Sequence, residues 1–204
     1  MNYFGHAAVA SWADPSPGTS LGAMLPDFAT MSGARLGEQT DPEIAAGVAL
    51  HHRTDSVFHQ AAPVLALMRE LDEKLEALGC ARGPRRAVAH IGTELLLDAT
   101  LLDVACYRES FLSAFTIDRT RVVWREGAEN FDQLWARMTT YGVPDDLREI
   151  DSISYRLQRM LSGRPLLAPN ADDVRAIAKG LSEHRARVEV ASETVLRVVR
   201  AGVL

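Results

Sequence analysis

Two sets of polar residues recur at helical spacing in segments that are otherwise apolar. The first set is His51, Asp55 and His59, and the second is His90, Glu94 and Asp98. A spacing of i, i+4, i+8 places the members of each set on one face of a helix. Imidazole and carboxylate groups together bind divalent metals, and this mixture favours Mn²⁺ or Mg²⁺, with Fe as a further choice, over structural zinc. We therefore expect the two helices to pack face to face around a metal site.

The second set lies in the segment HIGTELLLDATLLDVA, in which nearly every other position is apolar. A helix of this kind is buried on most sides, and a buried carboxylate needs a cation or a strong hydrogen-bond donor. A polar core, in which each histidine bonds to a carboxylate of the other helix, would meet the same need. Six ligand-type residues in two registers favour a metal or catalytic site over that alternative.

Helical periodicity dominates the chain and strand patterns are short, so we predict an all-α fold. The length of 204 residues suits one helical domain over residues 1–204. Asp41 is an N-cap candidate, with Pro42 at the first helical position. The expected helices span residues 3–12, 21–28, 42–60, 63–79, 84–115, 128–141, 145–162 and 170–201. Residues 13–20, 29–40 and 80–86 are expected to be loops.

Composition narrows the classes of protein. A net charge of −5 argues against general nucleic-acid binding, and 47% hydrophobic residues suffice for a globular core. No apolar run is long enough to span a membrane, and the N-terminal segment lacks the basic start of a signal peptide. Cys80 and Cys106 have no CxxC spacing, so we expect two reduced thiols in a cytoplasmic protein.

Other polar residues are candidates of lower specificity. His6 lies in a short apolar helix, and Asp27 ends an apolar segment. Three arginines, at Arg53, Arg85 and Arg86, are candidates to contact an anionic substrate, and a solvated position is the simpler explanation of each. His184, in the charged segment SEHRARVEV, is interpreted as a surface residue.

Four segments resemble the acyl carrier protein phosphodiesterase family: NYFGHAAVA, SLGAMLPDF, GVALHHRTDSVFHQAAPV and RRAVAHIGTELLLD. The matches to the family's N-F-x-x-H, G-N-x-x-x-D-F and G-I-x-x-H-R-x-I-D patterns are Asn2, Tyr3, His6, Gly22, Asp27, Phe28, Gly47, His51 and Asp55. The resemblance covers roughly the first half of the chain, residues 1–115, and the helical C-terminal half diverges.

This resemblance implies a helical array like that of HD-domain phosphohydrolases, with a metal held by His and Asp side chains. It also implies hydrolysis of the phosphodiester that joins 4′-phosphopantetheine to a serine of acyl carrier protein. The chain departs from the family pattern in several places: Ala23 replaces Asn, His59 and Glu94 replace Asp, and Ala99 and Thr100 replace a His-Phe pair. The chain thus keeps about as many polar residues at the family's site positions, but several of them are of a different amino-acid type.

The resulting assignment is a metal-dependent phosphodiesterase. The expected metal ligands are His6, His51, Asp55, Glu94 and Asp98. His59 or His90 would give a proton to the leaving oxygen or act as a further ligand, and Asp27 would bind metal or orient water. Three alternatives stay open: hydrolysis of a small phosphate ester or nucleotide, a helical metal protein that hydrolyses nothing, and an interaction protein with a polar core. The sequence leaves the oligomeric state open.

Overall fold

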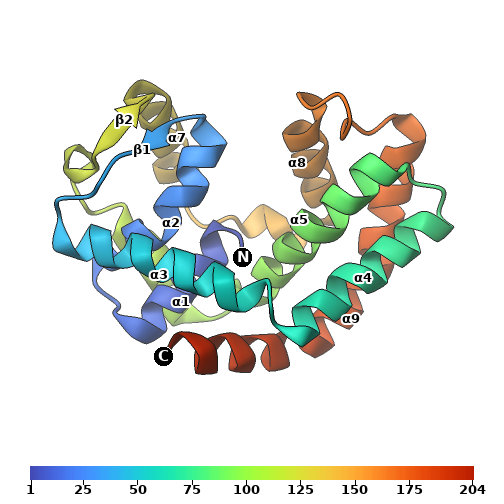
Figure 1. Cartoon of the computed structure of the whole chain (residues 1–204), viewed down its shortest axis with the longest axis horizontal. Helices are drawn as coiled ribbons and strands as arrows, with labels where there is room; N and C mark the ends of the chain where they lie inside the picture. The colour runs from blue at the N-terminus through green and yellow to red at the C-terminus, as the bar shows by residue number, and fades with distance from the viewer. The chain divides into compact units, whose positions relative to one another are not determined.

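The computed structural model describes all 204 residues and is almost entirely helical (Figure 1), which confirms the all-α prediction. The helices are α1 (Tyr3–Ala13), α2 (Pro17–Ser32), α3 (Pro42–Phe58), α4 (Ala62–Ala77), α5 (Arg82–Leu101), α6 (Ala105–Ala114), α7 (Ala128–Tyr141), α8 (Ile150–Ser162) and α9 (Ala171–Val203). Two 3₁₀ turns, η1 (Arg119–Arg121) and η2 (Asp145–Arg148), and two short strands, β1 (Arg35–Leu36) and β2 (Trp124–Glu126), complete the chain.

The chain forms two compact units, each built from separate stretches of sequence. Unit 1 comprises residues 1–58, 101–144 and 199–204, and unit 2 comprises residues 59–100 and 145–198. The division does not follow the boundary between the motif-bearing half and the C-terminal half, because residues 1–115 contribute to both units. The assignment of residues 1–204 to a single domain stays a prediction.

Unit 1 has an aromatic core between its helices. Its fully buried phenylalanines are Phe4, Phe28, Phe58, Phe111 and Phe131. The rings of Phe4 and Phe111 lie 5.7 Å apart, and those of Phe131 and Trp124 lie 4.5 Å apart, so ring contacts link α1 to α6 and β2 to α7. Strand β1 pairs antiparallel with β2. Burial of these large rings contributes to the apolar stabilisation of the unit, together with aliphatic side chains such as Leu21 and Ile44.

Helices α2 and α3 approach each other closely because two glycines face each other. A Cβ atom at Gly22 would clash with the carbonyl oxygen of Ile44, and one at Gly47 would clash with the carbonyl oxygen of Thr19. A Cβ at Gly47 would also lie 2.7 Å from the backbone nitrogen of Ala23. Only a residue without a side chain fits at either position. This contact fixes the spacing between two helices that carry candidate site residues.

The variant Gly47→Ala should therefore be destabilised by about 1–3 kcal/mol, because the new methyl group meets backbone atoms that cannot turn aside. Chemical denaturation measures the change. Gly163→Ala is the matched control: Gly163 has φ of −79°, and a Cβ at this position would have no other atom within 4 Å. Equal stability of the two variants would contradict the close contact.

Unit 2 is built from amphipathic helices. Helix α4 buries Val64, Leu67, Leu71 and Leu75, which recur at three- and four-residue spacing. Helix α8 buries Ile153, Leu157 and Leu161 in the same way, and α9 buries Leu181, Val188 and Val195. Arg187 bonds to both carboxylate oxygens of Glu70, at 2.9 and 3.1 Å, and so joins α9 to α4.

His184 corrects a prediction in this unit, since the structure buries it, with 2% of its surface exposed. It lies on the face of α9 that carries Leu181 and Val188, three and four residues away, and not on the charged face. Its neighbours Glu183, Arg185 and Arg187 make the segment polar in sequence. Burial lowers the pKa of His184, so its ring is neutral near pH 7.

Several helix boundaries differ from the prediction. Helix α2 runs from Pro17 to Ser32 and includes Pro26. It begins at Pro17 because the side chain of Ser16 caps the first turn, accepting a hydrogen bond from the backbone nitrogen of Thr19. Helix α5 starts at Arg82, so the arginines of residues 80–86 lie on a helix. The expected helix 84–115 is two helices, α5 and α6, and the expected helix 145–162 is η2 followed by α8.

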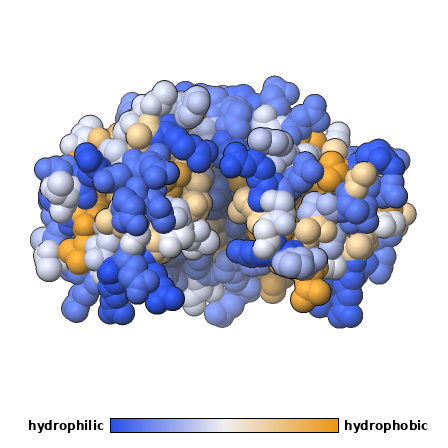
Figure 2. Space-filling view, turned by 90° about the horizontal axis from the view of Figure 1, so that it is seen from above, coloured by the Kyte–Doolittle hydropathy of each residue, from blue (hydrophilic) through white to orange (hydrophobic).

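The surface is that of a hydrophilic protein with scattered apolar residues. The face drawn in Figure 2 is mostly hydrophilic, and its hydrophobic residues form small groups. The most exposed large apolar side chains are Leu166, Tyr141 and Val190. No helix combines the length and apolar character that crossing a membrane requires. Cys80 and Cys106 are both free thiols.

Candidate metal centre

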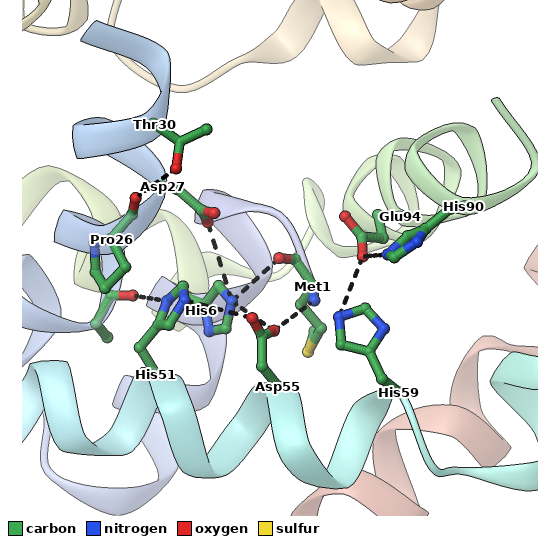
Figure 3. A network of polar contacts seen from close by, with 11 residues as sticks. Met1, His6, Pro26, Asp27, Thr30, His51, Asp55, His59, His90 and Glu94 are labelled. Carbon is green, nitrogen blue, oxygen red and sulfur yellow. Dashed lines mark hydrogen bonds and ion pairs between the residues drawn. The ribbon is translucent and has the colours of Figure 1, made fainter. Parts of the chain in front are cut away.

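Three helices of unit 1 bring His6, Asp27 and His51 together (Figure 3). Each offers one ligand atom, and the three atoms lie within 4.8 Å of one another. His6 Nε2 is 3.9 Å from Asp27 Oδ2, and the two imidazole rings stack with centroids 3.9 Å apart. The residues come from α1, α2 and α3, so the group exists only when all three helices are packed.

The orientation of the His51 ring is set by the backbone of α2. His51 Nδ1 lies 2.9 Å from the carbonyl oxygen of Ala23, to which it donates a hydrogen bond. This bond depends on the close approach of the two helices at Gly22 and Gly47. With Nδ1 bonded to Ala23, Nε2 faces the group; it donates to Asp55 in the metal-free protein and would bind a metal on losing that proton, as metal-binding histidines do.

Asp55 connects the two imidazoles. Its Oδ1 atom is 3.2 Å from His6 Nε2, and its Oδ2 atom is 3.4 Å from His51 Nε2. The Met1 amine also donates to Oδ1, at 2.9 Å. Asp55 therefore supplies negative charge to a group that holds two histidines, and it follows His51 by one helical turn, as the sequence spacing predicts.

The protonation of the group follows from this geometry. Burial lowers the pKa of His6 to about 3, so His6 is neutral near pH 7. Burial opposes protonation of His51 too, but the Asp55 hydrogen bond and the charge of Asp27 raise the pKa of His51 above its ordinary value. Burial would raise the pKa of Asp55, yet hydrogen bonds from His51 and His6 hold it well below its usual range.

The group has a buried side and an open side. The imidazole side chains are 0% and 6% exposed, whereas the carboxyl side chains of Asp27 and Asp55 are 25% and 33% exposed. Solvent therefore reaches the group from the carboxylate side. Asp27 lies at this open edge, in the last two turns of α2.

The donor set fits a divalent metal. Two imidazole nitrogens and two carboxylates form a mixed set that suits Mn, Fe or Zn. His6 Nε2 is the ring nitrogen that faces the two carboxylates, and it also donates to the carbonyl oxygen of Met1, at 3.1 Å. A metal bound at Nε2 would take the place of that hydrogen bond.

A second group of ligand-type residues lies in unit 2. It consists of His59, His90 and Glu94, whose ligand atoms also lie within 4.8 Å of one another. His59 is the first residue after α3, which ends at Phe58, so it does not continue the helical face of His51 and Asp55. The structure thus places the three members of the first sequence set in two groups. Asp98 is fully buried in α5 and belongs to neither group.

Comparison with known proteins identifies the family. The family model described as acyl carrier protein phosphodiesterase matches residues 1–197. The chain belongs to the acyl carrier protein phosphodiesterase family. The match extends far beyond the first half of the chain, to which the sequence motifs pointed. No curated protein and no solved structure matches the chain.

The family acts on a carrier protein, so the positions of the arginines bear on its function. Arg53 is exposed on α3. Arg85 bonds to Asp72, with Nε to Oδ1 at 3.1 Å, and also pairs with Glu76. Arg86 is exposed on α5. Of the three predicted substrate contacts, Arg85 is therefore already neutralised by two carboxylates.

Arg86 lines a groove of about 620 Å³ in unit 2. The groove is formed by Arg82, Gly83, Arg86, Ala87, His90, Ile91, Arg164, Leu166 and Leu167. At Gly83 the start of α5 touches the carbonyl oxygen of Leu166, where a Cβ would clash. Arg164, in the loop before α9, lines the same groove as Arg82 and Arg86. No sequence pattern indicates that it lies near them. We call this surface the basic groove.

Proposed function

We propose that this protein hydrolyses the phosphodiester between 4′-phosphopantetheine and the serine of holo-acyl carrier protein, at the group formed by His6, Asp27, His51 and Asp55. The supporting observation is that the four His and Asp residues that match the three family patterns meet in one group within unit 1. The family match over residues 1–197 gives the class of reaction. An HD-domain-like arrangement of the helices is part of this proposal.

A divalent ion, with Mn²⁺ or Mg²⁺ favoured, would be held by His6, Asp27, His51 and Asp55. When bound, such an ion polarises a phosphoryl oxygen and lowers the pKa of water. Two buried imidazoles add a preference for Mn²⁺ over Mg²⁺, because magnesium favours an all-oxygen environment. Glu94 and Asp98, also predicted as ligands, lie outside this group.

The residues themselves supply orientation and charge. The Ala23 carbonyl accepts a hydrogen bond from His51 Nδ1 and so orients this ring, and His6 stays neutral because it is buried. The Asp27 side chain is partly open to solvent, so it is suited to orient the attacking water in addition to contacting the ion. Proton donation to the leaving serine oxygen by His59 or His90 stays a prediction.

The test is hydrolysis of purified holo-acyl carrier protein after removal of metal, with and without added Mn²⁺ or Mg²⁺. Release of 4′-phosphopantetheine that depends on the added ion is the expected result, and mass spectrometry of the carrier protein detects it. Turnover of small phosphodiesters or nucleotides without turnover of holo-acyl carrier protein would support the alternative substrate class. No hydrolysis of either substrate would refute the proposed function.

The basic groove is our candidate for the carrier-protein contact. Acyl carrier proteins are acidic, and Arg82, Arg86 and Arg164 gather positive charge beside the apolar side chains of Leu166 and Leu167. The net charge of −5 of this chain repels an acidic partner at long range. A local positive surface such as the basic groove would offset this repulsion and orient the partner as it approaches. The groove mixes charge with apolar area, as protein interfaces do.

Reversing one charge in the groove tests this contact. We expect Arg86→Glu to raise KM for holo-acyl carrier protein by about tenfold, which corresponds to about 1.4 kcal/mol, and to leave kcat nearly unchanged. Arg137→Glu, at an exposed arginine outside the groove, makes the same change of net charge. Identical KM values for the two variants would exclude the groove as the docking surface.

A further inference from the structure

His59, His90 and Glu94 form a compact group whose polar atoms point at one another (Figure 3). His90 Nε2 lies 3.0 Å from Glu94 Oε1, and His59 Nε2 lies 3.7 Å from the same oxygen. The centroids of the two imidazole rings are 4.8 Å apart. Both histidines thus direct the same ring nitrogen at one carboxylate oxygen.

The group is positioned by helix geometry. His90 and Glu94 are one turn apart on α5, so their side chains lie on the same face. The Glu94 side chain is 11% exposed, whereas those of His59 and His90 are 35% and 51% exposed. A nearly buried carboxylate is therefore covered by two imidazoles that solvent can reach.

We propose that His59, His90 and Glu94 bind a divalent transition metal of the Zn²⁺ type, at a site separate from the group of His6, Asp27 and His51. Two imidazoles and one carboxylate are a ligand set found for zinc, with one position left for water or an anion. Imidazole donors favour Zn²⁺, Ni²⁺ or Cu²⁺ over Mg²⁺ and Ca²⁺.

The distances suit such an ion. Ligands at about 2.0–2.1 Å from a tetrahedral zinc ion lie about 3.4 Å from one another. The two observed separations, 3.0 and 3.7 Å, lie on either side of that value. Both imidazoles are partly exposed, so small rotations of their side chains complete the geometry without disturbing the core.

The two histidines make different contacts with Glu94. The separation of His90 from Glu94 is that of a hydrogen bond, but the separation of His59 from the same oxygen is too long for one. Two imidazoles that converge on a single oxygen would also repel each other once both were protonated. An ion bonded to all three residues removes that conflict, because it binds neutral imidazoles and an ionised carboxylate.

The test is Zn²⁺ binding to the metal-free full-length protein, measured by isothermal titration calorimetry. We expect two equivalents of Zn²⁺ in the wild type, one in His90→Ala and one in His51→Gln, and none in the double variant. His52→Ala, at another exposed histidine, should keep the wild-type stoichiometry. Undiminished binding by His90→Ala would overturn the proposal.

A second measurement separates this site from the proposed hydrolytic centre. In the His51→Gln variant, added Zn²⁺ should shift the imidazole NMR signals of His59 and His90, which a purely structural histidine pair would not show. Unchanged signals at saturating Zn²⁺ would reject the site even if the first group binds metal. Conversely, shifted signals in a protein without phosphodiesterase activity would support this site while the proposed function fails.

Discussion

The variant His51→Gln is expected to hydrolyse holo-acyl carrier protein about a thousandfold more slowly than the wild type. The loss corresponds to about 4 kcal/mol of transition-state stabilisation, the scale of a metal's contribution to phosphoryl transfer. His51 offers Nε2 to the group while Nδ1 bonds to Ala23, and a glutamine amide keeps the volume of the side chain without the imidazole donor. Steady-state kinetics measure the loss of rate, and elemental analysis of the same preparation measures the accompanying loss of bound metal.

His52→Gln is the matched control, because it makes the same chemical change one residue away. His52 is exposed on α3 and lies against His51 in a ring contact, with centroids 5.3 Å apart. We expect this variant to stay within about threefold of the wild-type rate, the range of a surface substitution. Wild-type activity in His51→Gln, with its fold intact, would remove His51 from the catalytic group.

The second prediction concerns the stability of the metal-free protein in acid. His6 is fully buried and its pKa is lowered to about 3, whereas in the unfolded chain it titrates near the ordinary value of 6.5. Below pH 6.5 the unfolded state therefore binds a proton that the folded state does not. As the pH is lowered below 6.5, the free energy of unfolding should therefore decrease. The slope approaches about 1.4 kcal/mol per pH unit, so the loss between pH 6.5 and 4.5 is about 2 kcal/mol.

The variant His6→Gln should lack this component, so the difference in unfolding free energy between variant and wild type must change with pH. His51 does not mask the effect, since a raised pKa costs stability as pH rises through it and adds no slope well below pH 6.5. Asp55, with a lowered pKa, adds acid sensitivity only below about pH 4.

Urea denaturation from pH 7 to 4.5 measures how the free energy of unfolding of each variant depends on pH, and His52→Gln should retain the slope of the wild type. Parallel curves for His6→Gln and wild type would contradict the buried, neutral state of His6.

The sequence predicts the unit 1 group better than it predicts the two polar sets. The pairing of His51 with Asp55 follows from helical spacing, and the roles of His6 and Asp27 came from the family patterns in α1 and α2. The position of His59 did not follow, because α3 ends at Phe58 and no glycine or proline marks that end. Spacing places residues on one face only while the helix continues.

Tertiary contacts explain the remaining differences. The separation of α5 from α6 at residues 102–104 has no glycine or proline, and Arg108 supports the turn by donating to the carbonyl oxygen of Leu102, at 3.2 Å. Arg85 resembles its neighbour Arg86 in sequence, yet it is neutralised by Asp72 and Glu76 of α4. Such partners are distant in sequence or depend on the angle of packing, so no local pattern reveals them.

The order of the two units along the chain has a consequence for biosynthesis. The polypeptide leaves unit 1 at residue 58, returns at 101, leaves again at 144 and returns at 199. Residues 199–204 belong to unit 1, and Gly202 contacts Val57 within it. Unit 1 is therefore incomplete until every residue of unit 2 has been translated. The helices that carry His6, Asp27 and His51 emerge from the ribosome before unit 2, and unit 1 is complete only after residues 199–204 have followed unit 2.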